Sequence, residues 1–285
     1  MAKICVIEKK HYKPLSYFLA NFKIKSATEI VKSESFWYSR FDLWWENNPA
    51  FSESEVRGLI LENNGKIVGF IGCIPSYFQL SGEQIIVYNE TTWRVDKKFR
   101  GIDSINMVLK LLDYTKESLH FRAGGRADAR AMQAWLGFEN IYPKEQIKLY
   151  YVILDLWNII LYKFPSVAIN KYYKSLFHPI IILYQLIIKV LMNITSSNYE
   201  VRIINNADNS FDELWKVTRT HVNNTNVRTS EVLNWYCSHK GTTNNIIFGC
   251  YQGNKLLGYL LCTCEDGDNI LKRITVVDFW GYMDD

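Results

Sequence analysis

The sequence has few cysteines, and none of them stands in a metal-binding arrangement. No two form a C-x-x-C pair, and none lies at ligand spacing from a histidine, which excludes the common zinc motifs. We predict buried free thiols in a reducing compartment, with structural disulfides as the alternative. The six thiols belong to Cys5, Cys73, Cys237, Cys250, Cys262 and Cys264.

The first residues do not predict a secretory leader, and the composition is not strongly basic. Residues 1–10 become charged before any long apolar run appears, which is unlike a secretory signal and predicts a cytoplasmic protein. The formal net charge of +4 is small for 285 residues. Because the aromatic residues are spread along the chain and not interleaved with a basic stripe, the sequence does not indicate a nucleic-acid partner.

Apolar residues are plentiful, and the first half of the chain alternates strand and helix patterns. Asn64-Gly65 and Ser81-Gly82 predict tight turns between strands, and Gly137 predicts a helix end. The order of elements predicts an α+β fold, a mixed sheet flanked by helices with one parallel crossover. The expected strands are 3–8, 57–62, 66–74, 77–80, 85–95, 119–123, 139–141 and 146–153, and the expected helices are 15–22, 33–45, 105–114 and 127–136.

A repeat follows in the second half. The segment 246–262, IIFGCYQGNKLLGYLLC, matches 58–73, GLILENNGKIVGFIGC, in its strand, turn, lysine and glycine. This similarity predicts two tandem copies of one unit, the second incomplete after a strand at 270–282. The expected domains are a first domain at 1–153, a helical apolar linker at 154–197 and a partial second domain at 198–285.

The linker contains a helix, 179–192, that is apolar on nearly every face. It is short for a membrane span, which needs about 20 residues, and Lys189 interrupts it. Packing between the two domains is the preferred interpretation, because a helix that is apolar all round is usually buried. Peripheral membrane contact and spanning are the alternatives.

Three segments together resemble one enzyme superfamily. WRVDKKFRGIDSINMVLKLL carries Val95, Arg100 and Gly101 before a helix expected from Ser104. ADARAMQAWLGFEN and FDLWWENNPAF add a helix ending in Leu-Gly-Phe and a Trp-x-x-x-Asn-Pro stretch. In this order they resemble the GNAT superfamily of acyl-CoA N-acyltransferases, in its tandem-domain bacterial form.

The resemblance implies acetyl-CoA or another acyl-CoA as co-substrate and an amine as acceptor, with an amino sugar of surface-polysaccharide biosynthesis as the suggested acceptor. Backbone N–H groups at a helix N-terminus can hold a pyrophosphate, and the pantetheine arm would pair with the end of strand 85–95 like an added strand. The implied cofactor-binding residues are Trp93, Arg94, Val95, Lys98, Arg100, Gly101, Ile102, Asp103 and Ser104.

The catalytic candidates lie on the same strand. The resemblance implies Glu90 as the general base, because it lies mid-strand a few residues before Val95, where many members carry a catalytic carboxylate. Burial in a strand would also raise its pKa. The alternatives are that Glu90 points outward or forms an ion pair with Arg94. Tyr88 shares its face and is a candidate neighbour of the acceptor. The usual general acid, a tyrosine, is replaced by Gln133, with Tyr142 nearby in sequence. Cys73 is expected to be a buried small side chain and not a nucleophile.

The match departs from the superfamily at the phosphate loop. Asp103 and Ile105 replace glycines, and a carboxylate at Asp103 either repels a phosphate or caps the helix that begins at Ser104. The sequence therefore leaves two alternatives to the acyltransferase: a non-catalytic binding or scaffold protein with a decayed CoA loop, and a Fem-type aminoacyl transferase acting with tRNA.

Overall fold

The computed structural model describes residues 2–22, 32–123, 127–139, 153, 155–163, 171–195, 199–238, 243–266 and 272–282. Its contacts divide the chain into two compact units. The first is formed mainly by Met1–Ala123 and Asn206–Gly241, and the second by Gly124–Asn205 and Thr242–Asp284. This grouping differs from the predicted domain boundaries, which stay a prediction.

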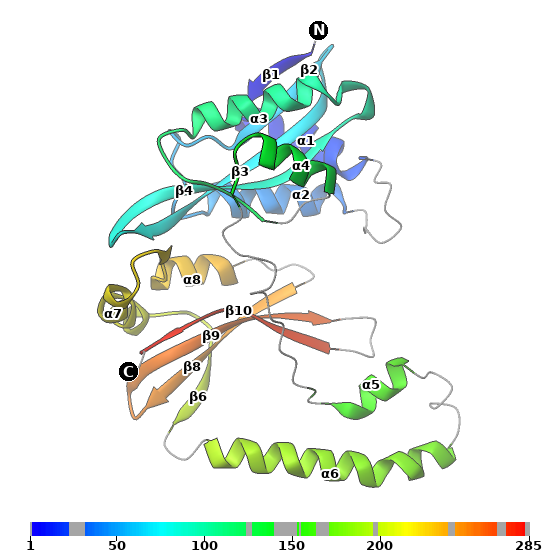
Figure 1. Ribbon diagram of the computed structural model, residues 1–285, viewed down its shortest axis with the longest axis vertical. Coiled ribbons are helices and arrows are strands. Elements are labelled where there is room, and N and C mark those ends of the chain that lie inside the picture. Colours follow the sequence, from blue (N-terminus) through cyan, green and yellow to red (C-terminus); the bar gives the residue numbers. More distant parts are fainter. Residues whose placement is uncertain are drawn as a thin grey trace. The chain divides into compact units, whose positions relative to one another are not determined.

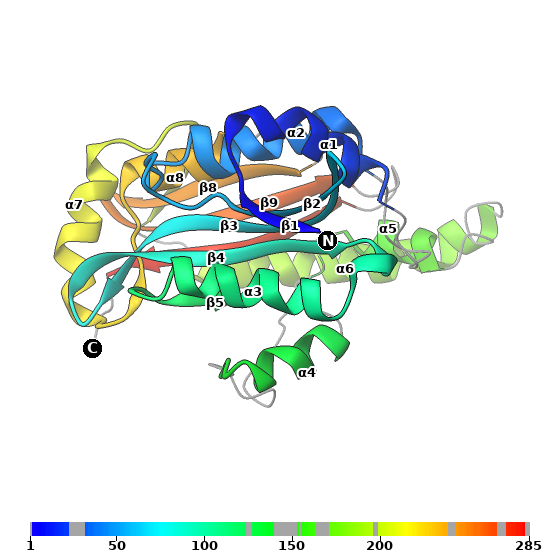
Figure 2. The same ribbon diagram turned by 90° about the horizontal axis from the view of Figure 1, so that it is seen from above.

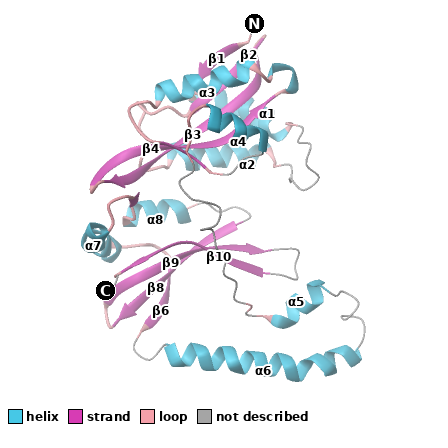
Figure 3. Cartoon of the chain, viewed as in Figure 1, coloured by secondary structure: helices cyan, strands magenta, loops and turns pink. Residues whose placement is uncertain are grey.

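The first unit is built on a mixed sheet (Figures 1 and 3). Its order is β1-β2-β3-β4-β5, with β7 added to β3. Neighbouring strands are antiparallel except for β4 and β5, which are parallel. The sheet confirms the predicted fold class. Its strands are β1 (Lys3–Val6), β2 (Gly58–Asn63), β3 (Lys66–Leu80), β4 (Glu83–Val95), β5 (His120–Arg122) and β7 (Thr225–Asn226).

Both predicted hairpin turns are present, with positive φ angles at Asn64, Gly65, Ser81 and Gly82. The predicted break between strands 66–74 and 77–80 is wrong, because β3 runs without interruption through Pro75. Pro75 is in register with a β4 residue, so the strand stays within the ladder at this point.

Helices cover the two faces of this sheet. The helices α1 (Tyr12–Ala20) and α2 (Glu34–Phe41) lie on one face and α3 (Ile102–Tyr114) on the other (Figure 2). The hydroxyl of Ser33 accepts a hydrogen bond from the Phe36 N–H and so caps α2, after which the chain continues as a π-helical turn, η2 (Asp42–Glu46). The aromatic side chains of α1, α2 and η2 form the core on their face, with Tyr12, Trp37, Phe41 and Trp45 all buried.

Residues 206–241 belong to the first unit, and hydrogen bonds connect them to the rest of it. They form α7 (Asn209–Thr218) and α8 (Ser230–Cys237). The Trp235 indole donates a 2.7 Å hydrogen bond to the Leu43 carbonyl, and the Gln79 side chain donates one of 2.9 Å to the Arg219 carbonyl. Sequence analysis did not predict α7.

The second unit contains an antiparallel sheet of order β10-β9-β8-β6. Most of the predicted strands 139–141 and 146–153 lies outside the described residues. None of the described helices is long and apolar enough to cross a membrane. The elements of this unit are α4 (Ala127–Trp135), α5 (Leu156–Lys163), α6 (Lys171–Thr195), β6 (Glu200–Ile204), β8 (Thr243–Gln252), β9 (Lys255–Asp266) and β10 (Lys272–Gly281).

The two sheets share an irregularity. In the β2–β3 hairpin the register shifts after the pair Leu61↔Gly69. In the β8–β9 hairpin it shifts after the pair Cys250↔Gly258. Both shifts lie at the same distance from the hairpin turn, and both sheets place their strands in the same order along the chain. This correspondence supports the predicted tandem repeat.

Gly58 provides a test of the fold. Its φ is +121°, and an added Cβ would lie 2.2 Å from the Ile71 carbonyl oxygen, whereas Gly65 has a φ of +71° with open space around it. Both alanine substitutions incur backbone strain, about 1–3 kcal/mol, but only Gly58→Ala adds a backbone clash. We expect Gly58→Ala to lower the free energy of unfolding in urea by at least about 2 kcal/mol more than Gly65→Ala. Equal losses would contradict the packing of β2 against β3.

Candidate active site

The central residue of the site is Glu90, where three strands meet. It is in register with Cys73 on β3 and with Arg122 on β5. The Glu90 side chain is 2% exposed, and its Oε1 lies 3.1 Å from Nη1 of Arg122. Burial raises the pKa of Glu90 to about 7, and the positive charge of Arg122 limits that rise. The ion pair predicted as the alternative, with Arg94, is not formed; Arg122 takes that place.

His120 lies next to this pair. Its Nε2 is 3.9 Å from Oε2 of Glu90, and its Nδ1 is 3.1 Å from the Thr115 hydroxyl. Burial, followed by the charge of Arg122, lowers the pKa of His120 to about 4. His120 is therefore neutral near pH 7, so its contact with Glu90 is not an ion pair and Arg122 carries the compensating charge.

Tyr88 lies on the same face, two residues before Glu90. Its hydroxyl donates a short hydrogen bond to the Glu55 carboxylate, and burial raises the Tyr88 pKa above its ordinary value. Cys73 is fully buried, and burial raises the pKa of its thiol, with the carboxylates of Glu90 and Glu55 adding to the effect. This confirms that Cys73 is a buried side chain and not an activated nucleophile.

A bulge follows directly after Glu90. Thr92 has a φ of +50°, and the register between β3 and β4 shifts there. The Arg122 guanidinium lies 5.1 Å from the centre of the Trp93 ring. Among the described residues, Oε2 of Glu90 and Nε1 of Trp93 are buried without a hydrogen-bond partner. Since buried polar atoms are nearly always paired, each of these atoms is available to bond a polar ligand or a water molecule.

The bulge coincides with the end of pairing between β4 and β5. The described β5 pairs with β4 only as far as Glu90↔Arg122, while β4 continues to Val95. Within the described residues, the outer edge of β4 beyond Glu90 therefore has no strand beside it. Such an edge can accept an extended ligand through main-chain hydrogen bonds.

The predicted cofactor residues do not all point toward this edge. The Arg94 guanidinium lies 5.0 Å from the Trp37 ring centre and donates a 3.3 Å hydrogen bond to the Leu19 carbonyl. Its side chain thus packs toward α1 and α2. Val95 is buried, and its carbonyl accepts a 2.9 Å hydrogen bond from Nε of Arg100, which fixes the turn that follows β4.

The turn ends at Gly101, where α3 begins. Helix α3 starts at Ile102 and not at the predicted Ser104, because Gly101, with a φ of +96°, reverses the chain directly into the first turn. Asp103 therefore lies inside the helix, and the expected cap by its side chain is absent: the N-cap residue is Gly101, and no side chain caps it. Ser104 is buried at the same end.

This helix end has unused donors. Among the described residues, none accepts a hydrogen bond from the backbone N–H of Ile102, Asp103 or Ser104; the first bond of the helix runs from the Ile105 N–H to the Gly101 carbonyl, at 3.0 Å. The exposed Lys98 lies nearby in the preceding turn. Free N–H groups at a helix start, with positive charge close by, favour an anion.

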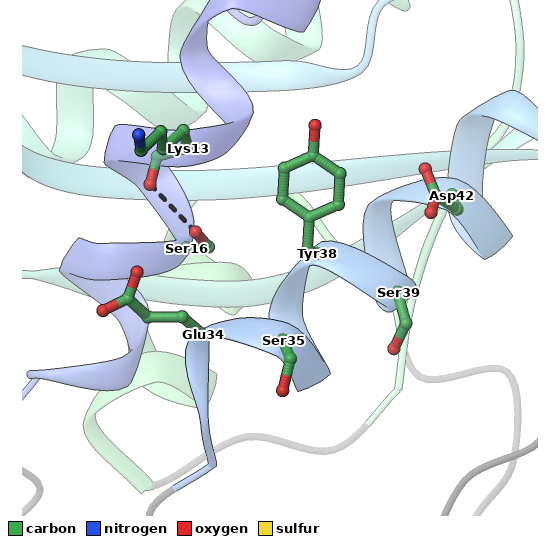
Figure 4. Close-up of a pocket in the computed structure, with 7 residues that line it drawn as sticks. All are labelled: Lys13, Ser16, Glu34, Ser35, Tyr38, Ser39 and Asp42. Carbon is green, nitrogen blue, oxygen red and sulfur yellow. Dashed lines mark hydrogen bonds between the residues drawn. The ribbon is translucent and has the colours of Figure 1, made fainter.

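A separate hollow of about 450 Å³ is lined by residues of α1, α2 and η2, on the face of the first sheet that α1 and α2 cover (Figure 4). None of the residues discussed above lines it. In Figure 4 the Ser16 hydroxyl donates to the Lys13 carbonyl within α1. The residues that line it are Lys13, Ser16, Glu34, Ser35, Tyr38, Ser39 and Asp42.

The two residues considered for the general acid are not part of the first unit's described site. Gln133 lies on α4, which groups with the second unit, and Tyr142 is outside the described residues. The residues that sequence analysis missed are Glu55, His120 and Arg122. Two of them alternate on the predicted strand 119–123, and this alternation of ionisable side chains in a short strand was the available signal.

No protein-family model and no curated protein sequence matches the chain. Solved structures do match it. A probable N-acyltransferase from Enterococcus faecalis V583 has a TM-score of 0.56 at 10% identity, covering 99% of this chain and 58% of that one. A GCN5-related N-acetyltransferase from Anabaena variabilis gives 0.54 at 10%, covering 99% and 59%. The chain has the GNAT fold.

A third structure with this fold is the N-myristoyltransferase of Saccharomyces cerevisiae with bound myristoyl-CoA and inhibitors. It gives a TM-score of 0.52 at 10% identity, covering 98% of this chain and 64% of that chain. The chain described here thus spans about three fifths of the length of these structures. At this identity the likeness concerns the fold alone.

The raised pKa of Glu90 has a consequence for stability. The folded pKa of about 7 lies above the ordinary value of 4.5, so the folded state is favoured while Glu90 is protonated and loses stability as pH rises from 4.5 through 7. At 1.36 kcal/mol per pKa unit, the loss is roughly 3 kcal/mol. We expect Glu90→Gln to abolish it, so that the variant gains stability relative to the wild type as pH rises.

Urea unfolding of both proteins across this pH range measures the difference. Glu83→Gln, which removes an exposed carboxylate from the same strand, is the control and should follow the wild type. A constant difference between wild type and Glu90→Gln at every pH would contradict the buried, protonated Glu90.

Proposed function

We propose that this chain is an acyl-CoA-dependent N-acyltransferase whose general base is Glu90. The observation that carries the proposal is the position of Glu90: a buried carboxyl with a pKa near 7, at the point where β4 and β5 stop pairing. A general base works best when its pKa is close to the working pH. An acceptor amine would approach Oε2, the Glu90 oxygen that has no hydrogen-bond partner among the described residues.

The residues of the turn and of α3 fit the phosphate end of an acyl-CoA. The N–H groups of Ile102, Asp103 and Ser104 are unused donors among the described residues, which suits a pyrophosphate. Lys98 would add charge, and Arg100 would act by holding the turn through Val95. Asp103 would lower the affinity by like-charge repulsion, but its carboxylate forms no cap that occupies the donors.

The open edge of β4 fits the extended part of such a molecule. Main-chain groups near Trp93 and Val95 would pair with the amides of a pantetheine arm. Arg94 is proposed to contribute its main chain only, since its side chain packs toward Trp37. An acyl-CoA would supply the activated acyl group as a thioester, next to the bulge at Thr92.

Each side chain then has one task. Glu90 would take a proton from the acceptor ammonium, which frees the nitrogen lone pair to attack the acyl carbon. The C–S bond of the thioester then breaks, and CoA leaves as the thiolate and takes up the surplus proton of the new amide nitrogen. Arg122, which lies over the Trp93 ring, would hold the Glu90 carboxylate in place. Tyr88, fixed by Glu55, would line the acceptor side. A small-molecule amine is the proposed acceptor, and an amino sugar is the finer proposal, which rests on the resemblance to tandem members of the superfamily.

The base is proposed to belong to the first sheet alone. Cys73, four residues after Gly69, is in register with Glu90. At the corresponding place in the second sheet Cys262, four residues after Gly258, is in register with Val276. A valine cannot accept a proton, so the second sheet would shape or support the protein without a base of its own.

The test is the release of CoA from acetyl-CoA with a panel of amines and amino sugars. We expect the wild-type rate to rise as pH increases through about 7, because Glu90 must be deprotonated. Glu90→Gln should lower kcat/KM by about 10²–10⁴-fold while the shift of Tm by acetyl-CoA stays unchanged. Glu83→Gln is the control for both readouts. Full activity of Glu90→Gln would refute the assigned base, and no Tm shift with saturating acetyl-CoA would refute the co-substrate.

A further inference from the structure

The segment between Asp155 and Glu200 holds all of the net positive charge of the chain. It has no acidic residue and four lysines, Lys163, Lys171, Lys174 and Lys189. The whole chain has 33 Lys and Arg against 29 Asp and Glu, so the remainder has 29 of each and is neutral. This segment forms α5 and α6.

Helix α6 also presents a broad apolar face. At 100° per residue its exposed apolar side chains from 180 to 190 cover an arc of about 160°. Each of them is between 42% and 60% exposed. The predicted packing of this helix between two domains stays a prediction. The members of the arc are Ile180, Ile182, Leu183, Leu186, Ile187 and Val190.

The rest of the helix surface is different. Ile181 is buried, and Tyr184, next to it around the helix, donates a short hydrogen bond to the Ile153 carbonyl. Gln185 and Lys189 are exposed and lie beside the apolar arc. The helix thus has one side that packs on its own unit, one apolar side in solvent, and a polar edge with a cation between them.

We propose that α6 binds the surface of an anionic lipid bilayer, with the apolar arc among the acyl chains and the lysines at the headgroups. An exposed apolar face of this size marks an interaction site. A helix with an apolar face and Lys189 at its edge, in a segment with four lysines and no acidic residue, is similar to helices that lie in the membrane interface. The charge decides between occupants: a second copy would bring two basic segments together, whereas anionic headgroups attract them.

The test uses the full chain and sedimentation with vesicles of phosphatidylcholine, with or without phosphatidylglycerol. We expect sedimentation with the anionic vesicles, and a decrease as salt is raised. Leu186→Asp introduces a charge into the arc, and Gln185→Asp introduces the same charge next to it on the same turn. Binding should fall about tenfold further for Leu186→Asp than for Gln185→Asp. Lys189→Gln should weaken binding to anionic vesicles only.

Three results would overturn the proposal. The first is no sedimentation with either vesicle. The second is equal binding of Leu186→Asp and Gln185→Asp. The third is a dimer in solution that Leu186→Asp abolishes, which would assign the arc to a second copy. Matching thermal melts of the variants and the wild type exclude loss of folding as the cause, and acyl transfer plays no part in the readout.

Discussion

The structure of the candidate site depends on the short parallel pairing of β4 with β5. This pairing brings Arg122 opposite Glu90, and it provides the counter-charge without which a buried carboxylate would cost several kcal/mol. Because the described β5 goes no further, the bulge at Thr92 can turn Trp93 onto Arg122 and leave the β4 edge free. Fifteen residues, Glu90–Ser104, therefore contain the proposed base, the β4 edge and the turn into α3, in that order.

Local patterns in the sequence predicted most of the first sheet and its helices, but not the continuity of β3, the start of α3 or the strand β7. Several features have local causes that a sequence displays. They are the turns at Asn64-Gly65 and Ser81-Gly82, the cap at Ser33, and the helix end at Gly137, which has a φ of +85°. The sequence also singled out Glu90 as a candidate base, through the resemblance and its place in a strand before Val95, and this role stays a proposal. The raised pKa of Glu90 follows from burial.

The partners of Glu90 were not predictable in the same way. Arg122 and His120 are about thirty residues away in sequence and reach Glu90 only through strand pairing. The direction of the Arg94 side chain depends on the aromatic core of α1 and α2, so neighbours in sequence could not give it. The start of α3 was misplaced because the conformation of Gly101, and not a side-chain cap, decides where that helix begins.

Backbone hydrogen exchange with and without saturating acetyl-CoA tests directly whether the β4 edge and the start of α3 together hold an acyl-CoA. If they do, exchange slows in two separate segments, 91–95 and 101–104, with little change in the second sheet. Unchanged exchange in both segments at saturating acetyl-CoA would show that no acyl-CoA binds there.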